Sequence, residues 1–362
     1  MIKQKDHFHG SDLEKIEQIY GIRKEELISF SANVNPLGIS PLLREALIQK
    51  IDTITAYPDR EYTSLRRSIA AYCGTTAEHV LVGSGATELI SLFIQLARPK
   101  KALVLGPTYS EYEREIALGG GQTVYYPLSE KRRFRLEIND FLSQLDETLE
   151  LLVICNPNNP TSSSVERADM TRILDACLAR SIYVMIDETY IEFAADMDRL
   201  SSVPLTDAYP NLIVLRGTSK FFAAPGLRLG YAIAGSLRLI DEINARKNPW
   251  TIHSLAAAAG ETMFQDADYI RKTKALIASE RTRIYHLLKD HPVFDAYEPD
   301  ANFLLVRIRG EELTAKELFT RALRQGMMIR DCSDFPFLND SYLRFCFMLP
   351  EQNDRLLACL LA

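Results

Sequence analysis

The sequence lacks several features that would place it in a specialised class of protein. Its six cysteines are scattered, with neither a CxxC pair nor a cysteine–histidine spacing, so neither a disulfide scaffold nor a zinc site is indicated. The formal net charge is −6, which gives no electrostatic case for nucleic acid binding. No uncharged apolar run reaches the ~18 residues that a membrane-spanning helix needs.

What remains is ordinary for a soluble globular protein. The chain has 362 residues, of which 47% are hydrophobic and 25% charged, enough for one large domain and a smaller one. Most cysteines lie in apolar stretches, which is typical of small buried thiols in a reducing compartment. The first ten residues lack the apolar core of a signal peptide. We therefore expect a cytoplasmic protein without membrane or nucleic acid partners.

Short apolar runs alternate with helical patterns through the middle of the chain. Nearly all-apolar strands are typical of a mostly parallel sheet buried on both faces, so the pattern predicts a doubly wound α/β domain. The predicted strands are His79–Val82, Ala102–Leu105, Thr123–Tyr126, Leu151–Cys155, Tyr183–Ile186, Leu212–Leu215 and Leu229–Ala234. The predicted helices between them are Thr87–Ala97, Ser110–Leu118, Glu166–Arg180 and Ser236–Ala245.

The pattern changes at about Pro249, and the remainder predicts a smaller α+β domain. Its expected helices are Ala267–Asp290, Ala315–Gln325 and Gln352–Leu361, and its expected strands are Phe303–Ile308, Met328–Arg330 and Tyr342–Phe347.

The residues that suggest chemistry follow the predicted strands. Gly83-Ser84-Gly85-Ala86-Thr87 lies between a strand and a helix, where backbone N–H groups and the helix dipole can meet an anion, although such a run alone often means only a tight turn. Asn159 follows another strand, Asp187 ends a third, and Lys220 and Arg228 follow a fourth. Ligands of such sheets bind beyond the carboxyl ends of the strands, which is where the Gly83–Thr87 run, Asn156 and Asp187 fall.

The order and spacing of these residues resemble the fold-type I enzymes that depend on pyridoxal 5'-phosphate (PLP), the aminotransferase superfamily, over nearly the whole chain. The resemblance implies the PLP-transferase fold, with a large domain at 41–248, a small domain at 249–362 and an arm at 1–40 that joins the small domain. It implies that Lys220 forms an imine with PLP and that Asp187 pairs with the pyridine nitrogen. Tyr190 and Asn159 match residues that bond the ring hydroxyl.

The same resemblance implies a phosphate site and a second subunit. Tyr109 matches the aromatic side chain that stacks on the cofactor ring, and Tyr57 matches a tyrosine that reaches the PLP phosphate of a neighbouring subunit. A homodimer with shared active sites follows. The residues expected to hold the phosphate are Gly85, Ala86, Thr87, Ser219 and Arg228.

Two positions depart from the family pattern. Ser162 stands where glycine is usual in the turn after Asn159, so the turn is open to local differences. Gly217 stands where a phosphate-binding Ser or Thr is common, so either Thr218 or Ser219 compensates or the phosphate site has one hydrogen bond fewer.

Other segments are similar to the threonine-phosphate decarboxylase family. They are His9-Gly10, although Ser11 replaces a second glycine, the run from Ser31 to Gly38, Pro249-Trp250-Thr251-Ile252 and Ile329-Arg330-Asp331-Cys332. This likeness implies decarboxylation of O-phospho-L-threonine, or of O-phospho-L-serine, to aminopropanol or ethanolamine phosphate for cobalamin biosynthesis. The residues it implies for binding this small phosphorylated amino acid are His9, Asn33, Arg330 and Arg344, and it implies no metal.

Other functions stay open. A histidinol-phosphate-type aminotransferase that uses glutamate and 2-oxoglutarate is the main alternative, because sequence does not reveal which bond at Cα is broken. A non-catalytic PLP-binding regulator or an inactive scaffold is less favoured, since the 1–40 arm is too short for a DNA-binding domain and Lys220 and Asp187 are both present. Phosphothreonine and phosphoserine differ by one methyl group, and the residue that returns a proton to Cα is not identified.

Overall fold

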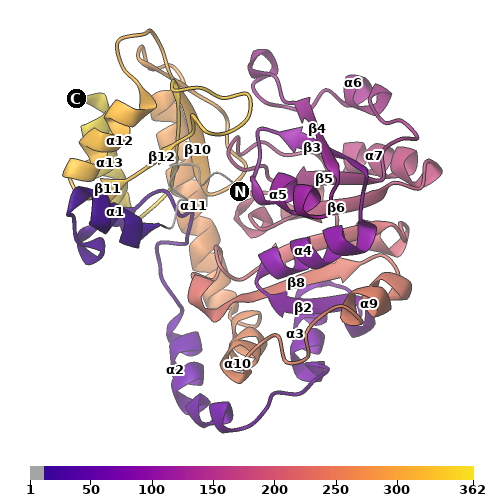
Figure 1. The fold of residues 1–362 in the computed structure, drawn as a ribbon. Helices are drawn as coiled ribbons and strands as arrows, with labels where there is room; N and C mark the ends of the chain where they lie inside the picture. Colours follow the sequence, from indigo (N-terminus) through magenta and orange to yellow (C-terminus); the bar gives the residue numbers. More distant parts are fainter. Residues whose placement is uncertain (1–11) are drawn as a thin grey trace.

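A seven-stranded sheet forms the centre of the larger part of the molecule in this computed structural model, which describes residues 12–362 (Figure 1). Its strand order is β2-β8-β7-β6-β5-β3-β4, and only β8 runs against the other strands. The strands are β2 (Val80–Ser84), β3 (Lys101–Gly106), β4 (Gln122–Pro127), β5 (Leu151–Cys155), β6 (Tyr183–Asp187), β7 (Leu212–Gly217) and β8 (Leu229–Ala234).

Helices cover both faces of this sheet, which explains why its strands are apolar on both sides. On one face Leu81 and Val104 pack with α4, α5 and α9, and on the other Val80 and Leu103 belong to a core that includes α3, α7, α10 and α11. Each buried aliphatic side chain contributes about 1.5–3 kcal/mol, so the two layers account for much of the stability. The helices are α2 (Pro41–Gln49), α3 (Thr63–Cys73), α4 (Ala86–Ala97), α5 (Glu111–Leu118), α6 (Ile138–Ser143), α7 (Arg167–Ala179), α8 (Met197–Leu200), α9 (Leu237–Asn244), α10 (Ser254–Met263) and α11 (Ala267–Leu288).

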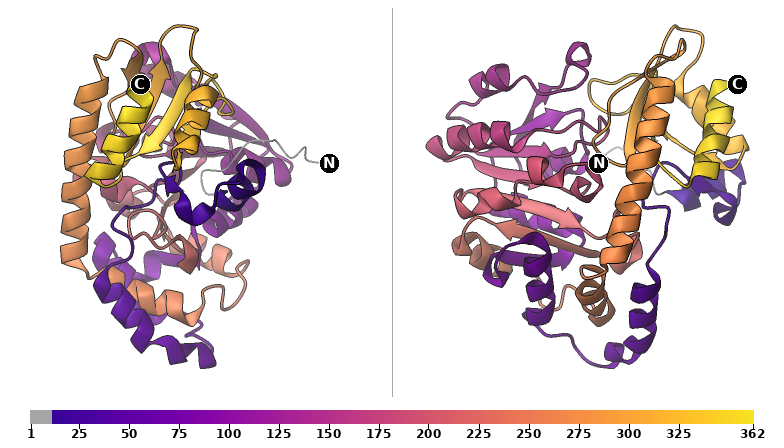
Figure 2. Two further views of the ribbon diagram at one scale, coloured as in Figure 1. Left: turned by 90° about the vertical axis from the view of Figure 1, so that its left-hand side faces the viewer. Right: turned by 180° about the vertical axis from the view of Figure 1, so that it is seen from behind.

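The smaller part contains a four-stranded antiparallel sheet in the order β12-β13-β10-β9. The long helix α11 runs beside it and reaches down to the larger part (Figure 2). Its strands are β9 (Phe294–Ala296), β10 (Phe303–Ile308), β12 (Arg330–Asp331) and β13 (Tyr342–Cys346), and its helices are α12 (Ala315–Arg324) and α13 (Pro350–Leu361).

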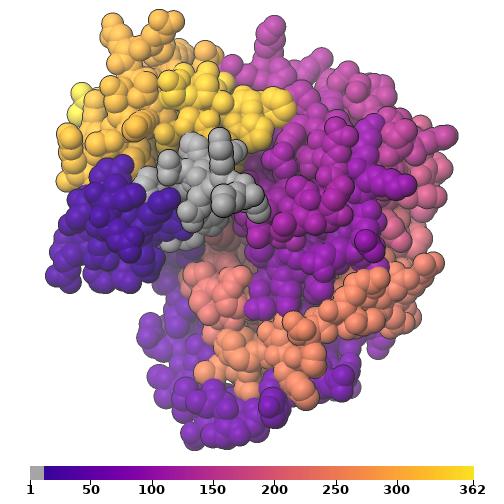
Figure 3. Space-filling model, viewed as in Figure 1, coloured from indigo at the N-terminus to yellow at the C-terminus, as the bar shows by residue number. Residues whose placement is uncertain are grey.

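The N-terminal segment packs against this smaller part. Strand β1 (Ile28–Ser29) pairs in parallel with β11 (Met327–Met328), and Tyr20 of α1 (Leu13–Tyr20) meets Phe319 of α12 edge to face at 6.2 Å. In the space-filling view the indigo segment lies against the orange and yellow part of the chain (Figure 3).

The predicted fold class is confirmed, and the structure corrects several local predictions. The strands Leu151–Cys155, Leu229–Ala234 and Phe303–Ile308 have the predicted bounds. The single strand predicted at Met328–Arg330 is wrong, because the chain changes partner there: β11 pairs with β1, whereas β12 pairs with β13. Strand β9 and helix α10 were not predicted.

The domain boundary, the cysteines and membrane spanning were also addressed by the sequence. Helix α10 packs on α2 and α3, which lie on the other side of a division at residue 249, so this domain boundary stays a prediction. All six cysteines are unbonded, and five of them are buried. Within residues 12–362, no helix has the length and apolar character needed to cross a bilayer.

Candidate active site

Strand direction brings the predicted site residues to one edge of the large sheet. The parallel strands β5, β6 and β7 end there with Cys155, Asp187 and Gly217. Because β8 is antiparallel, its beginning lies at the same edge, where Gly230 is paired with Gly217 and with Gly83 of β2. Arg228, which immediately precedes β8, is therefore brought beside the strand-to-helix turn of β2 and α4.

This turn and Arg228 together present groups suited to binding an anion. Gly85 has a φ of +80°, and a Cβ there would come within 2.4 Å of Arg228 Nη2. A Cβ on Gly230 would meet the backbone nitrogen of Ala86 at 2.3 Å, so both glycines are required by close approach. Thr87 lies in the first turn of α4. The helix N-terminus and the guanidinium thus present N–H donors and positive charge together.

Asp187 is buried and has neutral hydrogen-bond donors. Its Oδ2 accepts from Tyr112 at 2.6 Å, and its Oδ1 accepts from the backbone N–H of Thr189 at 2.9 Å and from the Thr189 hydroxyl at 2.5 Å. No cation forms an ion pair with it among residues 12–362. A buried carboxylate without a counter-ion is costly, so the site suits a cationic ligand atom.

Tyr109 lies against the same carboxylate. Its ring meets that of Tyr112 edge to face at 5.6 Å. Burial, and then the nearby carboxylates of Glu111 and Asp187, raise the pKa of Tyr109 to about 12, so its hydroxyl stays protonated near neutral pH. Tyr112, in the first turn of α5, was missed in the sequence analysis, although it lies only three residues after Tyr109 in the chain.

Lys220 is held at the carboxyl end of β7, where its Nζ donates to the carbonyl of Ala32 at 2.6 Å. Burial, and then the positive charges of Arg344 and Arg228, lower its pKa to about 8. A lowered pKa makes the neutral, nucleophilic amine more available near neutral pH, which imine formation requires.

Arg344 reaches the site from β13 of the smaller sheet. It is only 4% exposed, its Nη2 donates to the Ser31 carbonyl at 2.7 Å, and its Nη1 donates to Asn159 Oδ1. Its Nε has no partner among the described residues. Burial lowers its pKa, and Arg330 adds to this. A buried guanidinium that has only neutral partners is suited to an anionic ligand.

Asn33 and Tyr190 lie beside each other in the same region. Asn33 Nδ2 donates to Tyr190 Oη at 3.3 Å, while Asn33 Oδ1 is buried without a partner among residues 12–362. Asn33 adopts a φ of +56°, which asparagine tolerates better than most residues. The segment that contains Ser31, Ala32 and Asn33 thus lies beside Tyr190, Lys220 and Arg344, and the role of Asn33 in substrate binding stays a prediction.

Arg330 and Arg344 are directly opposite each other on neighbouring antiparallel strands. Side chains at such positions share a face and lie close together, and like charges there are destabilising. Arg330 has a carboxylate partner that the sequence analysis missed: its Nη2 donates to both oxygens of Asp334, at 2.8 and 2.7 Å.

Not every predicted residue joins this group. Tyr57 is 80% exposed and packs against Trp250, with ring centres 4.8 Å apart. Ser219 lies next to Lys220 in the loop after β7, and its role stays a prediction. His9 lies outside the residues that the structure describes.

The structure also explains the two departures from the family pattern. Ser162 takes the left-handed conformation that favours glycine, with a φ of +60°. Its hydroxyl accepts from the N–H of Ala301 at 2.9 Å, and its carbonyl accepts from the N–H of Asp300 at 2.8 Å. The Thr218 hydroxyl donates to the carbonyl of Leu229 at 3.0 Å. Ser219 is therefore the better placed of the two residues to compensate for Gly217.

The residues present fit PLP on these observations. The turn at Gly85 together with Arg228 suits a phosphate, Asp187 suits a protonated ring nitrogen, and Lys220 supplies an amine with a lowered pKa. The partnerless Arg344 Nε and Asn33 Oδ1 remain available to a substrate.

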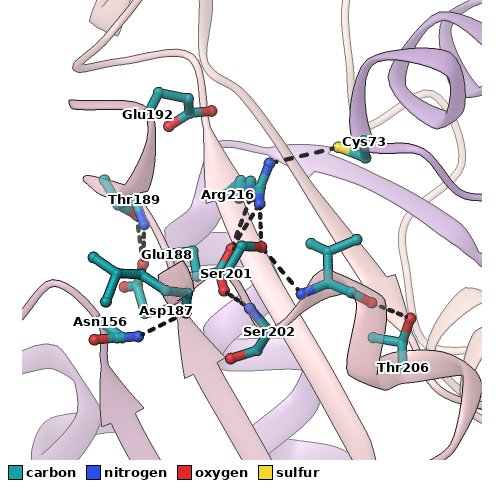
Figure 4. Close-up of polar contacts among 12 residues, drawn as sticks. Cys73, Asn156, Asp187, Glu188, Thr189, Glu192, Ser201, Ser202, Thr206 and Arg216 are labelled. Atoms are coloured by element: carbon teal, nitrogen blue, oxygen red, sulfur yellow. Dashed lines mark hydrogen bonds and ion pairs between the residues drawn. The ribbon is translucent and has the colours of Figure 1, made fainter. Parts of the chain in front are cut away.

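A buried charge network lies directly behind Asp187 (Figure 4). Glu188 Oε2 accepts from Arg216 Nε at 3.0 Å and from Nη2 at 2.8 Å, and Arg216 Nη2 also donates to Ser201 at 2.7 Å. Both charged residues are almost fully buried, so removing either would leave an uncompensated charge. The pair joins β6 to β7 one residue beyond Asp187 and so supports the strand end that carries it.

The chain belongs to the class I and II aminotransferase family, whose model matches residues 25–360. PLP is the cofactor of this family. The chain is 34% identical to the threonine-phosphate decarboxylase of Salmonella typhimurium over 97% of its own length and 95% of that protein.

Solved structures agree with the family. The histidinol-phosphate aminotransferase of Clostridium acetobutylicum is 32% identical, with a TM-score of 0.85 and coverage of 91% of this chain and 97% of that one. The histidinol-phosphate aminotransferase of Sinorhizobium meliloti, solved with PLP bound, has the same fold at 22% identity, with a TM-score of 0.82 and coverage of 99% and 98%.

Lys220 and Lys247 offer a matched test of the cofactor site, because burial lowers the pKa of both amines but only Lys220 lies at the sheet edge. We expect Lys220→Ala to abolish the visible absorbance of lysine-linked PLP, and Lys247→Ala to retain it. Borohydride reduction followed by peptide mass mapping should find the cofactor on Lys220. A Lys220→Ala protein that keeps the absorbance would contradict the assignment.

Glu192 generates a prediction about stability and pH. It is fully buried, its Oε2 has no partner among the described residues, and burial raises its pKa from 4.5 to about 7. Between pH 4.5 and about pH 7 the folded protein therefore keeps a proton on Glu192 that the unfolded chain releases. The free energy of unfolding consequently falls as the pH rises through this window. As the pH rises through this window, the free energy of unfolding of Glu192→Gln should increase relative to that of wild type by up to about 3 kcal/mol.

The measurement is the free energy of unfolding in urea at several pH values, with Glu147→Gln as an exposed control. The difference between wild type and Glu147→Gln should stay constant with pH. If the difference for Glu192→Gln is equally constant, Glu192 is not protonated in the folded protein.

Proposed function

We propose that the protein is a PLP-dependent decarboxylase of O-phospho-L-threonine that forms aminopropanol phosphate for cobalamin biosynthesis. O-phospho-L-serine is the second substrate to be compared. The family assignment and the 34% identity to a threonine-phosphate decarboxylase support this choice. Within the structure, the observation that carries it is the pair of arginines opposite each other on β12 and β13.

Two adjacent guanidinium groups match a substrate with two anionic ends. The unfavourable contact between like charges at Arg330 and Arg344 is relieved when anions lie between or beside them. A phosphorylated amino acid carries a carboxylate and a phosphate in one small molecule. Arginine binds both groups well, because its planar fork matches their oxygen geometry.

The neighbours of each arginine suggest which end it binds. Arg344 is close enough to Lys220 to lower the pKa of its amine, so it is placed for the carboxylate, which is attached to the same carbon as the substrate's amine. Arg330, one strand further out, is then placed for the phosphate. Asn33, with its free Oδ1, is a further polar contact for the substrate.

The chain's own groups would then perform the following tasks. Arg344, held by Ser31 and Asn159, fixes the carboxylate in one orientation. When bound, PLP supplies an electron sink conjugated to the substrate's amine. Asp187 would pair with the ring nitrogen of bound PLP, and Tyr112 and Thr189 keep its carboxylate in place. The Lys220 amine, with a pKa of about 8, is suited to returning a proton to Cα after carbon dioxide leaves.

Transamination of histidinol phosphate is the alternative, supported by the 32% identity to the Clostridium enzyme. Histidinol phosphate has a phosphate but no carboxylate, so Arg344 would serve only glutamate in the other half of that reaction. In the proposed decarboxylation both arginines serve one substrate.

We expect the PLP-loaded protein to release carbon dioxide from O-phospho-L-threonine without any keto-acid acceptor, and we would measure O-phospho-L-serine in parallel. The two substrates differ by one methyl group, which in a hydrophobic pocket corresponds to about 10–200-fold discrimination in kcat/KM. No release, together with formation of glutamate from histidinol phosphate and 2-oxoglutarate, would establish the aminotransferase instead.

We further propose a homodimer formed through α2 and the turn that follows it. Ile48, Ile51 and Ile54 are 68%, 48% and 61% exposed, close in sequence to the exposed Tyr57. Clustered exposed apolar side chains are characteristic of protein interfaces. A second copy of the chain would cover them and would bring Tyr57 towards the phosphate pocket of its partner, as the family resemblance implies.

Ile54 and Ile19 offer a matched test, because they are similarly exposed, at 61% and 57%, but only Ile54 lies in this patch. Burial of one isoleucine contributes about 1.5–3 kcal/mol, so Ile54→Glu should weaken the dimer at least about tenfold and Ile19→Glu should not. Sedimentation equilibrium measures both. A monomeric wild type, or equal behaviour of the two variants, would rule out this interface.

A further inference from the structure

The loop between β12 and β13 encloses the guanidinium of Arg330 from two sides. Arg330 Nη2 donates to Asp334 Oδ1 at 2.8 Å and to Oδ2 at 2.7 Å. The guanidinium carbon lies 5.1 Å from the centre of the Phe335 ring. The side chains of Arg330 and Asp334 are 14% and 16% exposed, so this contact is largely removed from solvent.

Asp334 binds only one of the three nitrogen atoms of the Arg330 guanidinium. Both of its oxygens meet Nη2, whereas a carboxylate that takes the full arginine fork engages two nitrogen atoms. The N–H groups on Nε and Nη1 have no protein partner among residues 12–362. Such a contact leaves most of the donor groups of Arg330 for an anion, so it orients the side chain rather than replacing the ligand.

The loop that carries Asp334 is itself well held. The N–H of Phe335 donates to the carbonyl of Cys332 at 3.1 Å, and the N–H of Leu338 donates to the carbonyl of Phe335 at 3.1 Å. Phe337 meets Tyr125 of β4 edge to face at 5.7 Å. A Cβ on Gly106 would approach the Phe337 ring to 2.9 Å, so the loop also packs against the end of β3. Asp334 is thus anchored to both sheets.

We propose that Asp334 is a positioning residue that holds Arg330 for the substrate's phosphate. Arg344 faces Arg330 across the strand pair, and repulsion between the two cations would otherwise push the more exposed Arg330 outward. The Asp334 carboxylate offsets this repulsion, while Phe335 limits rotation of the guanidinium plane. Arg344 needs no such acid because neutral oxygens and burial hold it. This inference rests on the proposed function, which assigns the phosphate to Arg330.

Asp334→Asn tests the proposal because it keeps the size of the side chain and removes its charge. Hydrogen bonds to charged groups are strong enough that we expect the KM for O-phospho-L-threonine to rise about tenfold or more, with kcat changed less than about twofold. Asp331→Asn is the matched control: it removes the same charge three residues away, where Asp331 accepts from the N–H of Ser333 instead of from Arg330. Its KM should equal that of wild type.

Asp334→Glu keeps the charge, and we expect it to recover most of the loss. The visible absorbance of bound PLP should be the same in all variants, which shows that each protein is folded and loaded. A KM for Asp334→Asn that equals that of wild type would overturn the proposal. A lower KM would do so too, because it would make Asp334 a competitor of the phosphate.

A failure of the proposed function is distinguishable from a failure of this inference. If wild type releases no carbon dioxide from O-phospho-L-threonine, the function is wrong, and Asp334 is judged by calorimetric binding of inorganic phosphate to the PLP-loaded protein. Weaker binding to Asp334→Asn than to wild type and Asp331→Asn supports the positioning role. Equal binding to all three rejects it.

Discussion

The direction of one strand is the constraint on which the site depends. Six strands of the large sheet run the same way, so their carboxyl ends and the loops that follow them meet at one edge. The reversed strand β8 lies between β2 and β7 and begins at this same edge. Arg228 therefore meets the N-terminus of α4, although about 140 residues separate them in the chain. If β8 ran with the others, Arg228 would lie at the opposite edge.

The charged side chains that the structure describes at this edge are not paired with each other, so their charges are left to complement a ligand. Asp187 has neutral donors, and Arg344 has neutral acceptors. The true ion pair Arg216–Glu188 lies just behind them and has no group left over for a ligand. A fully paired network is a structural support, whereas isolated buried charges lower stability unless something else binds them. This contrast separates the supporting residues from those proposed to meet cofactor and substrate.

Much of the fold and of the cofactor site could be predicted from the sequence, because the signals are local. An apolar run of five residues predicts a buried strand such as β5, and a polar residue that ends such a run, as Asp187 does, falls at the ligand edge. Contacts that depend on how a loop folds or on which strand is the partner left no such signal. Asp334 is only four residues from Arg330, yet it meets that side chain only because the loop folds back. The segment Met328–Arg330 was misassigned because its strand partner changes within three residues.

The cofactor end and the substrate end of the proposed site lie on different parts of the fold. PLP would meet residues at the ends of strands buried on both faces, where a substitution disturbs the core of the large sheet. Arg330 and Asp334 instead belong to a two-residue strand and its connecting loop, at the border of the four-stranded sheet. A change at this border disturbs less of the core than a change at the end of a central strand. If the proposed function holds, the arginine pair with its acid is therefore the part of this chain where substrate choice can change at the smallest cost in stability.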